Sequence, residues 1–367
     1  MAVTEQAAPP KVPEEAITDL LTRLERYRPV EVPKELETGA GVDRAWLDAL
    51  VSRWRGGYDW REHEARIRSW PWELVDGETP LRVLHQRVSA DAPTVLLLHG
   101  WPDSVLRFEK VLPLLSEYNV VVPALPGFPF SAPSSARGMS ATDMAEVVAQ
   151  AMESLGYNNY VVSAGDVGSD VAELVIRHHT DSVPAAHLTD VSQLHFLQDL
   201  PADLTEEERA YVGRGQAWQA AEGGYMHEQS TKPATLAIGL GDSPVGLLGW
   251  IGEKLWSWSD HDDRDISTVF TPDEVLTWVS AYWFGENIGT SFAPYALKSA
   301  LPNEHVATPV VLTIFPKDLA NAPRSFAERL FDVRSFQELP RGGHFAAWEQ
   351  PEQYVAGVRA AVAIART

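Results

Sequence analysis

The chain has no cysteine, which excludes disulfide frameworks, zinc–thiolate sites, iron–sulfur clusters and a cysteine nucleophile. Positive charge is scarce, because 30 Lys and Arg stand against 51 Asp and Glu, a formal net charge of −21. Such a chain repels nucleic-acid phosphates and anionic lipids, so neither is an expected partner. Its most apolar runs, such as residues 94–98 and 310–315, are far shorter than the roughly 20 residues of a membrane-spanning helix. The start lacks the pattern of a secretory signal, so we expect a cytoplasmic protein without a membrane anchor.

Aromatic side chains are plentiful instead, with 13 Trp, 12 Phe and 10 Tyr among 367 residues. They are numerous enough to line an apolar cavity for a hydrophobic ligand, although packing in a large core explains them equally well. A hydrophobic content of 45% excludes disordered and collagen-like proteins.

From residue 94 onward, short apolar runs alternate with longer segments of helical period. This alternation predicts an α/β fold with a mostly parallel sheet and helices on both faces. Upstream, an Asp-Gly turn between two apolar runs predicts an antiparallel hairpin at residues 72–75 and 81–88. The other strands are expected at residues 94–98, 119–124, 160–163, 184–188, 310–315 and 334–338, and the helices at 105–115, 141–155, 169–179, 324–330 and 351–363.

The alternation stops over residues 191–304, where helical patterns and a Trp-rich stretch replace it. A structureless loop of this length is unusual in a compact domain, so we expect an inserted helical cap. Residues 1–70 are also helical in pattern and predict an N-terminal extension packed on the core. The α/β core is then expected to comprise residues 71–190 and 305–367.

The segment NNYVVSAGDVGSD predicts a strand, a sharp turn and a helix, with Asp166 in the turn. A turn of this kind carries the nucleophile of α/β-hydrolases, usually a serine, and requires small residues two positions before and after it. Ala164 and Gly168 meet that requirement. Because aspartate is also a favoured N-cap residue, a simple capping role for Asp166 stays open at this point.

Two further segments complete a hydrolase pattern. HGWPDS follows the strand at 94–98, where this fold places an oxyanion-hole donor, so we expect the backbone N–H groups of Trp101 and Val167 to form the hole. An ordinary turn with Ser104 as a helix cap is the alternative. LPRGGHFAAWEQP presents His344 after the last strand, and Asp318 follows the preceding strand in FPKDL. We expect Asp318 to orient His344, with Asp190 as the competing acid.

Taken together, these motifs resemble those of the microsomal-type epoxide hydrolases, a family of α/β-hydrolases with an N-terminal extension. The resemblance runs over nearly the whole chain and includes YDWREHEARI, PALPGFPFSAP, GGYMHEQ and SAYWFGENIG. It implies that Asp166 is the nucleophile and that Tyr225 and Tyr282 of the cap donate hydrogen bonds to the epoxide oxygen. The sequence departs from the family pattern at Asp103, where glycine is common, and at Val167, where tryptophan is common.

The resemblance implies that a hydrophobic, aryl or bulky epoxide is converted to a vicinal diol. Asp166 would form an alkyl ester, and water activated by His344 and Asp318 would cleave it. Epoxide and water are the expected partners, a homodimer stays open, and so does a role in natural-product biosynthesis or detoxification. No cofactor is expected. A haloalkane dehalogenase and a non-catalytic binding protein of the same fold are the alternatives.

Three other segments give weaker signals. The acidic run at residues 260–265 suits a solvated loop better than a metal site, so no metal is expected. GLGDSPVG lacks the third glycine of a dinucleotide-binding loop. Residues 289–293 imitate a serine-bearing turn without a preceding strand and are expected to form a loop or a helix start.

Overall fold

A computed structural model describes residues 7–36, 39–133, 138–198, 200–261, 265–297 and 299–367. Within these residues one mostly parallel sheet has the strand order β1-β2-β4-β3-β5-β6-β7-β8. Strand β2 pairs antiparallel with both β1 and β4, and the remaining pairs are parallel. The strands are β1 (Trp72–Val75), β2 (Leu81–Gln86), β3 (Thr94–Leu98), β4 (Asn119–Pro123), β5 (Val161–Ala164), β6 (Ala186–Leu188), β7 (Val306–Ile314) and β8 (Phe331–Glu338).

The central strands are apolar because both faces of the sheet are covered. Every residue of β3, β4 and β5 is buried, as expected for parallel strands between two helical layers. The predicted hairpin and the predicted strands are confirmed, with ends that shift by a few residues. The helices of this α/β part are α4 (Ala141–Ser154), α5 (Val167–His178), α13 (Arg324–Leu330), α14 (Ala346–Glu349) and α15 (Pro351–Ile364), with a 3₁₀ turn η4 (Thr180–Ser182).

One predicted helix is wrong. Residues 105–115 form two separate 3₁₀ turns, η2 (Val105–Phe108) and η3 (Leu112–Leu115), in place of one α-helix. Pro113 explains the break, because proline has no N–H to donate and its ring clashes with the carbonyl group four residues earlier. Ser104 does cap the first turn, where its hydroxyl accepts the N–H of Leu106.

A long helical insertion lies between β6 and β7, as the loss of alternation predicts. Its elements are α6 (Leu194–Leu197), α7 (Glu206–Glu222), α8 (Gly224–Thr231), α9 (Pro233–Asp242), α10 (Pro244–Ser257), η5 (Ile266–Thr268), α11 (Pro272–Gly285), η6 (Thr290–Phe292) and α12 (Ala293–Ala296). We refer to residues 194–296 as the helical insertion. The short elements η6 and α12 confirm the expected helix start at residues 289–293.

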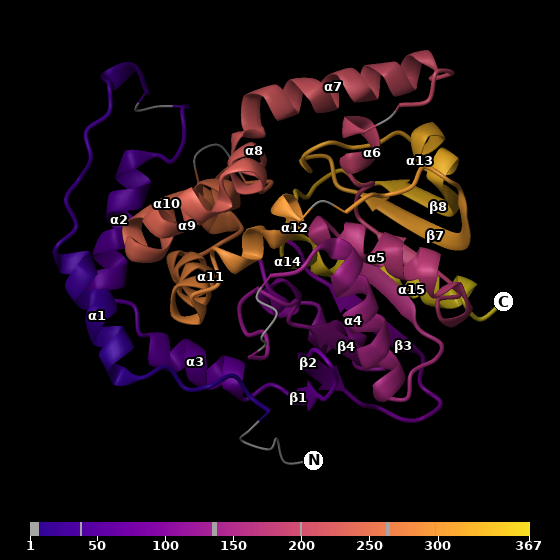
Figure 1. Ribbon diagram of the computed structural model, residues 1–367, viewed down its shortest axis with the longest axis horizontal. Coiled ribbons are helices and arrows are strands. Elements are labelled where there is room, and N and C mark those ends of the chain that lie inside the picture. The colour runs from indigo at the N-terminus through magenta and orange to yellow at the C-terminus, as the bar shows by residue number, and fades with distance from the viewer. Residues whose placement is uncertain (1–6, 37–38, 134–137, 199, 262–264, 298) are drawn as a thin grey trace.

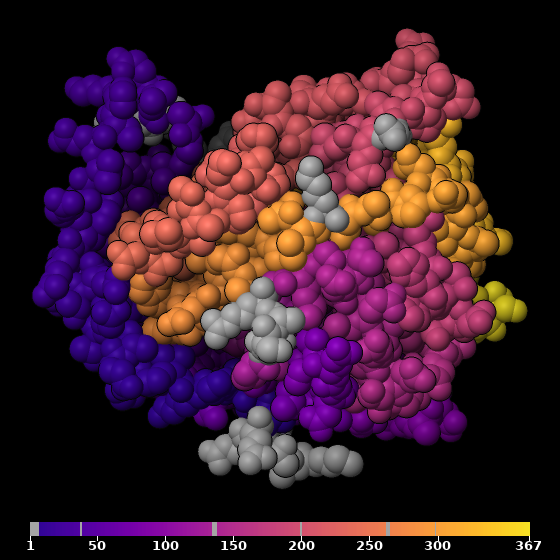
Figure 2. All heavy atoms as spheres, in the orientation of Figure 1, coloured from indigo at the N-terminus to yellow at the C-terminus, as the bar shows by residue number. Residues whose placement is uncertain are grey.

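The N-terminal helices lie along the outside of this insertion. They are α1 (Glu14–Glu25), α2 (Arg44–Gly56) and α3 (Trp60–Arg68), with a 3₁₀ turn η1 (Lys34–Leu36). Helix α1 contacts α10, and α2 contacts both α10 and α11. Figures 1 and 2 show the indigo N-terminal part directly against these orange helices. Ion pairs from Arg23 to Asp242 and from Arg53 to Asp273 join the two parts.

No single described helix is long and apolar enough to cross a bilayer; α9 and α10 pass that test together, but they meet at a bend of 114°. Among the same residues, no three His, Asp or Glu side chains are grouped so that they hold a metal ion. Residues 262–264 of the acidic run lie outside the described part of the chain.

Candidate active site

Asp166 lies in a strained turn between β5 and α5. Its backbone has φ 59° and ψ −137°, a left-handed conformation that a non-glycine residue rarely adopts. The neighbouring glycines permit the close packing there, because a Cβ on Gly168 would lie 2.5 Å from the carbonyl oxygen of Leu98. The Asp166 side chain makes no capping hydrogen bond to α5. The geometry therefore fits a reactive group that faces a cavity better than a helix cap.

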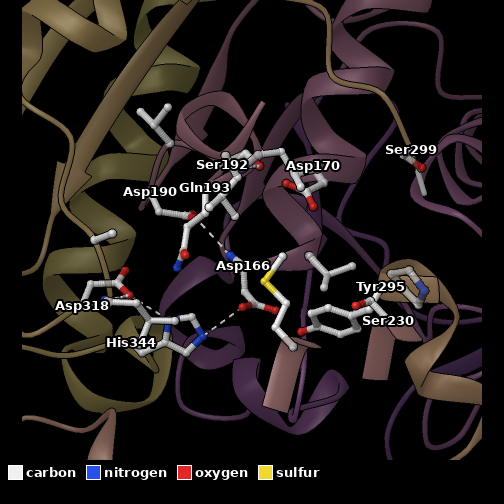
Figure 3. Close-up of a pocket in the computed structure, with 18 of the residues that line it drawn as sticks. Asp166, Asp170, Asp190, Ser192, Gln193, Ser230, Tyr295, Ser299, Asp318 and His344 are labelled. Atoms are coloured by element: carbon white, nitrogen blue, oxygen red, sulfur yellow. Dashed lines mark hydrogen bonds and ion pairs between the residues drawn. The ribbon is translucent and has the colours of Figure 1, made fainter. Parts of the chain in front are cut away.

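His344 and Asp318 stand in line behind Asp166 (Figure 3). Nε2 of His344 lies 3.3 Å from Oδ2 of Asp166, and Nδ1 lies 2.7 Å from Oδ1 of Asp318. Burial alone would lower the pKa of His344, but the carboxylates of Asp318 and Asp166 raise it to about 10. The imidazole of the free protein is therefore protonated at neutral pH.

Several groups hold the loop that carries His344. The carboxylate of Glu349 accepts the N–H groups of Gly343 and Phe345, each at 2.9 Å. The guanidinium of Arg107 donates to the carbonyl oxygen of His344 at 2.7 Å and is also hydrogen-bonded to the buried Asp103. These contacts hold the backbone of residues 343–345 after β8 and so fix the position and orientation of the His344 imidazole.

Asp103 gives this chain a buried ion pair below the site. Burial disfavours its charge, but Arg107 and His99 lower the pKa of Asp103 to about 2. Its Oδ1 accepts the N–H of Gly100 at 2.7 Å. Asp103 therefore ties the turn after β3 to Arg107, and through Arg107 to the His344 loop.

The predicted oxyanion donors lie beside Asp166. The N–H of Trp101 donates to Oδ1 of Asp166 at 2.7 Å. Val167 is buried at the first position of α5, directly after Asp166. Gly100 makes this approach possible, because a Cβ there would lie 2.2 Å from Oδ1 of Asp166.

Asp190, the competing acid, has a different set of partners. Its Oδ1 accepts the hydroxyl of Ser169 at 2.6 Å and the backbone N–H of Asp166 at 3.3 Å. Burial, together with the charge of Asp318, raises the pKa of Asp190 to about 7. Asp190 therefore supports the turn of the nucleophile, whereas Asp318 is the carboxylate hydrogen-bonded to His344.

A cavity of about 310 Å³ opens over Asp166 and His344. Its wall contains Tyr225 of α8 and Tyr295 of α12, whose ring centroids lie 6.0 Å apart. Burial raises the pKa of both tyrosines well above the usual value, so both keep their protons at neutral pH. The indole of Trp101 stacks on Tyr225 with 5.3 Å between the ring centroids and 7° between the planes.

Tyr282 is not among the residues that line this cavity. It is fully buried on α11, and its hydroxyl donates to the carbonyl oxygen of Asp103 at 2.9 Å. This geometry corrects the expectation for Tyr282, because its hydroxyl is already engaged on the α/β part. Tyr295 takes the expected position beside Tyr225. Tyr295 lies 13 residues after Tyr282 and two residues after the segment at 289–293, whose sequence predicts only a loop or a helix start.

The site therefore has the features of an α/β-hydrolase with an aspartate in the nucleophile turn. Comparison with known families gives a match to the epoxide hydrolase N terminus over residues 6–108 and to the alpha/beta hydrolase fold over residues 93–232. A Stigmatella aurantiaca protein named "Putative epoxide hydrolase" is 34% identical over 366 residues, which cover 95% of this chain and 82% of the relative. The chain belongs to the epoxide hydrolase family, whose members are hydrolases that act on ether bonds.

Other relatives agree with this assignment. Epoxide hydrolase 1 of Sus scrofa is 29% identical, with 94% of this chain and 86% of the relative covered. The solved structure of Aspergillus niger epoxide hydrolase has 28% identity and a TM-score of 0.84, covering 98% of this chain and 97% of that one. The juvenile hormone epoxide hydrolase of the silkworm Bombyx mori has 25% identity and a TM-score of 0.85, covering 98% and 94%.

Proposed function

We propose that this protein hydrolyses an epoxide to a vicinal diol through a covalent ester on Asp166. The observation that carries the proposal is the line of Asp318, His344 and Asp166 at the wall of a cavity that also holds two neutral tyrosines. The strained backbone at Asp166 directs a carboxylate, in place of the more usual hydroxyl, toward this cavity.

In the first half-reaction, Oδ2 of Asp166 attacks an epoxide carbon and the C–O bond of the ring breaks. The hydrogen bond from Trp101 to Oδ1 leaves the second oxygen on the side of His344. Tyr225 and Tyr295 donate to the leaving oxygen, which takes a proton as the ring opens. Because both tyrosines are neutral, they are donors at neutral pH.

In the second half-reaction, water cleaves the ester. Esterification removes the negative charge of Asp166, which is one of the two charges that raise the pKa of His344. The pKa of His344 then falls, and its proton passes to solvent while the tyrosine that protonated the leaving oxygen takes one back. The neutral imidazole, held by Asp318, then takes a proton from the attacking water. The N–H groups of Trp101 and Val167 stabilise the oxyanion that forms on the Asp166 carboxyl.

The cavity accommodates an epoxide with a moderately large substituent, which agrees with the expected hydrophobic or aryl epoxide. Leu194, Leu197, Met226 and Leu319 contribute apolar surface to it. Few aromatic side chains reach the cavity. Most of them pack against each other behind it, as Trp258 does against Trp101, Tyr225 and Phe345. The cytoplasmic location and the homodimer stay predictions.

A single turnover with excess enzyme and styrene oxide in ¹⁸O-water tests the mechanism. The ester pathway places unlabelled oxygen in the first diol and label in the peptide that contains Asp166. Label in the diol with none in Asp166 would mean direct attack by water. A parallel assay with 1-bromohexane tests the haloalkane dehalogenase alternative, for which bromide release without diol formation from any epoxide would be decisive.

A further inference from the structure

A second carboxyl group faces the cavity and has no part in the proposed chemistry. Asp170 lies in the first turn of α5, four residues after Asp166, which precedes the helix, and both side chains line the same cavity. Asp170 lines the same cavity, and Figure 3 shows its carboxyl group above the open space over Asp166.

The surroundings of Asp170 differ from those of the other carboxyl groups in the cavity wall. Asp166 receives the N–H of Trp101, and Asp318 receives His344 and the N–H of Leu319. Asp190 receives Ser169. For Asp170 the nearby donor is the hydroxyl of Ser192, whose side chain also lines the cavity.

Within the described part of the chain, no cation is among the groups that act most strongly on Asp170. The charged groups that act on it most strongly are the carboxylates of Asp190, Asp166 and Glu173. Burial, reinforced by these like charges, raises the pKa of Asp170 well above its usual value. These surroundings favour the protonated form of Asp170, a carboxylic acid with an O–H group to donate.

The buried position of the Asp170 carboxyl group requires a hydrogen-bonding partner. Asp170 sits in the first turn of a helix whose following residues are largely buried and apolar, and an apolar side chain there would extend the hydrophobic wall. A carboxyl group buried at this place is costly unless it is hydrogen-bonded. Ser192 meets part of that need, and the open cavity lies on the remaining side.

We propose that Asp170, with Ser192, forms a polar subsite that hydrogen-bonds a hydroxyl or carbonyl oxygen of the epoxide substrate, in the same cavity as the carbon that Asp166 attacks. The substrate class is thus an oxygenated epoxide rather than a pure hydrocarbon. Val167 also lines this cavity, beside Asp166. This inference rests on the proposed function and specifies its substrate.

A matched pair of probes tests the subsite. In 1,2-epoxyhexane and 4,5-epoxypentan-1-ol the same chain ends in a methyl or a hydroxyl group, far enough from the ring to leave its reactivity alone. The ratio of kcat/KM for the two probes is measured for wild type, Asp170→Leu and Asp170→Asn. Asp181→Asn, which alters an exposed aspartate in η4, serves as the surface control.

We expect Asp170→Leu to lower the preference for the hydroxyl probe by about tenfold, the effect of losing one buried hydrogen bond. Asp170→Asn, which keeps a neutral donor, should stay within about twofold of wild type, as should Asp181→Asn. An unchanged ratio in Asp170→Leu overturns the subsite. An equal loss of preference in Asp170→Asn and Asp170→Leu overturns the claim that Asp170 acts as a neutral hydrogen-bond donor.

A binding measurement separates this inference from the proposed function. Dissociation constants for the product pair, hexane-1,2-diol and pentane-1,2,5-triol, are obtained from tryptophan fluorescence and need no turnover. We expect the same tenfold change in their ratio in Asp170→Leu. If wild type hydrolyses no epoxide but this ratio changes, the proposed function fails and the subsite stands. If styrene oxide is hydrolysed while neither ratio changes, the subsite alone fails.

Discussion

Two regions of the molecule contribute to the site in different ways. The α/β part supplies Asp166, Asp318 and His344 from loops that follow β5, β7 and β8, and hydrogen bonds fix each of them. The helical insertion supplies Tyr225 and Tyr295 from short helices that lie over the sheet edge. A parallel sheet determines where the ends of its strands meet, whereas no comparable register determines where an inserted helix places a side chain.

The largest effect is expected in the α/β part. Asp166→Asn removes the nucleophile, so steady-state diol formation should fall by about 10⁶-fold. Initial rates with styrene oxide measure this, and peptide mass spectrometry excludes deamidation back to aspartate. A residual rate within tenfold of wild type would show that another group attacks the epoxide.

His344→Gln should come next. It removes the base for hydrolysis while Asp166 remains able to attack, so kcat should fall by about 10⁴-fold as the ester accumulates. Intact-protein mass spectrometry should then show the mass of one added epoxide. The double variant with Asp166→Asn is the control, and an adduct in that variant would place the ester elsewhere.

Within the helical insertion, Tyr295→Phe should slow the alkylation step by about 10²-fold, because it removes one of two proton donors. Tyr225→Phe should behave alike, and the double variant should be slower than either. Stopped-flow measurement of the single-turnover tryptophan signal gives the rate. Equal slowing by Tyr282→Phe would show that Tyr282 of α11 is also a proton donor to the epoxide oxygen.

The two half-reactions should also differ in their pH dependence. The pKa of His344 is raised to about 10 in the free enzyme, so the imidazolium persists below that pH. The alkylation rate should therefore be flat from about pH 8 to 9, above the pKa of about 7 of Asp190. Ester hydrolysis requires the neutral imidazole and should rise by up to tenfold per pH unit below the lowered pKa. Rapid quench separates the steps. A hydrolysis rate that falls with rising pH would contradict this assignment.

The smallest effect is expected at Tyr282. Tyr282→Phe removes its hydrogen bond to the carbonyl oxygen of Asp103 and should lower the free energy of unfolding by about 1 kcal/mol. Urea denaturation measures this. No change in stability would show that the hydrogen bond contributes nothing to the junction between α11 and the turn after β3.

The sequence predicts the two regions unequally. Strand patterns located the strands that position Asp166, Asp318 and His344, because an apolar run and the turn after it are local features. Whether Tyr282 or Tyr295 lines the cavity depends on where α11 ends and on the path of the chain through η6. Packing between residues far apart in the sequence determines both features. Pro113 indicates a break within residues 105–115, whereas the helical period of the apolar residues around it predicts one continuous helix. Asp170 follows Asp166 by four residues, yet only the folded chain shows that both line one cavity.

The ion pairs between the N-terminal helices and the helical insertion bear on how substrate enters and product leaves. Arg23 and Arg53 join α1 and α2 to Asp242 and Asp273, on the far side of the insertion from the sheet. A wide swing of α9 to α11 away from the sheet would have to break these contacts together with the packing of α1 and α2. Entry of substrate and release of product are therefore expected to depend on rotation of side chains that line the cavity, such as Leu197 and Met226, rather than on a hinged domain. The opening that these rotations allow, more than the volume of the cavity, then sets the upper size of an epoxide that the enzyme accepts.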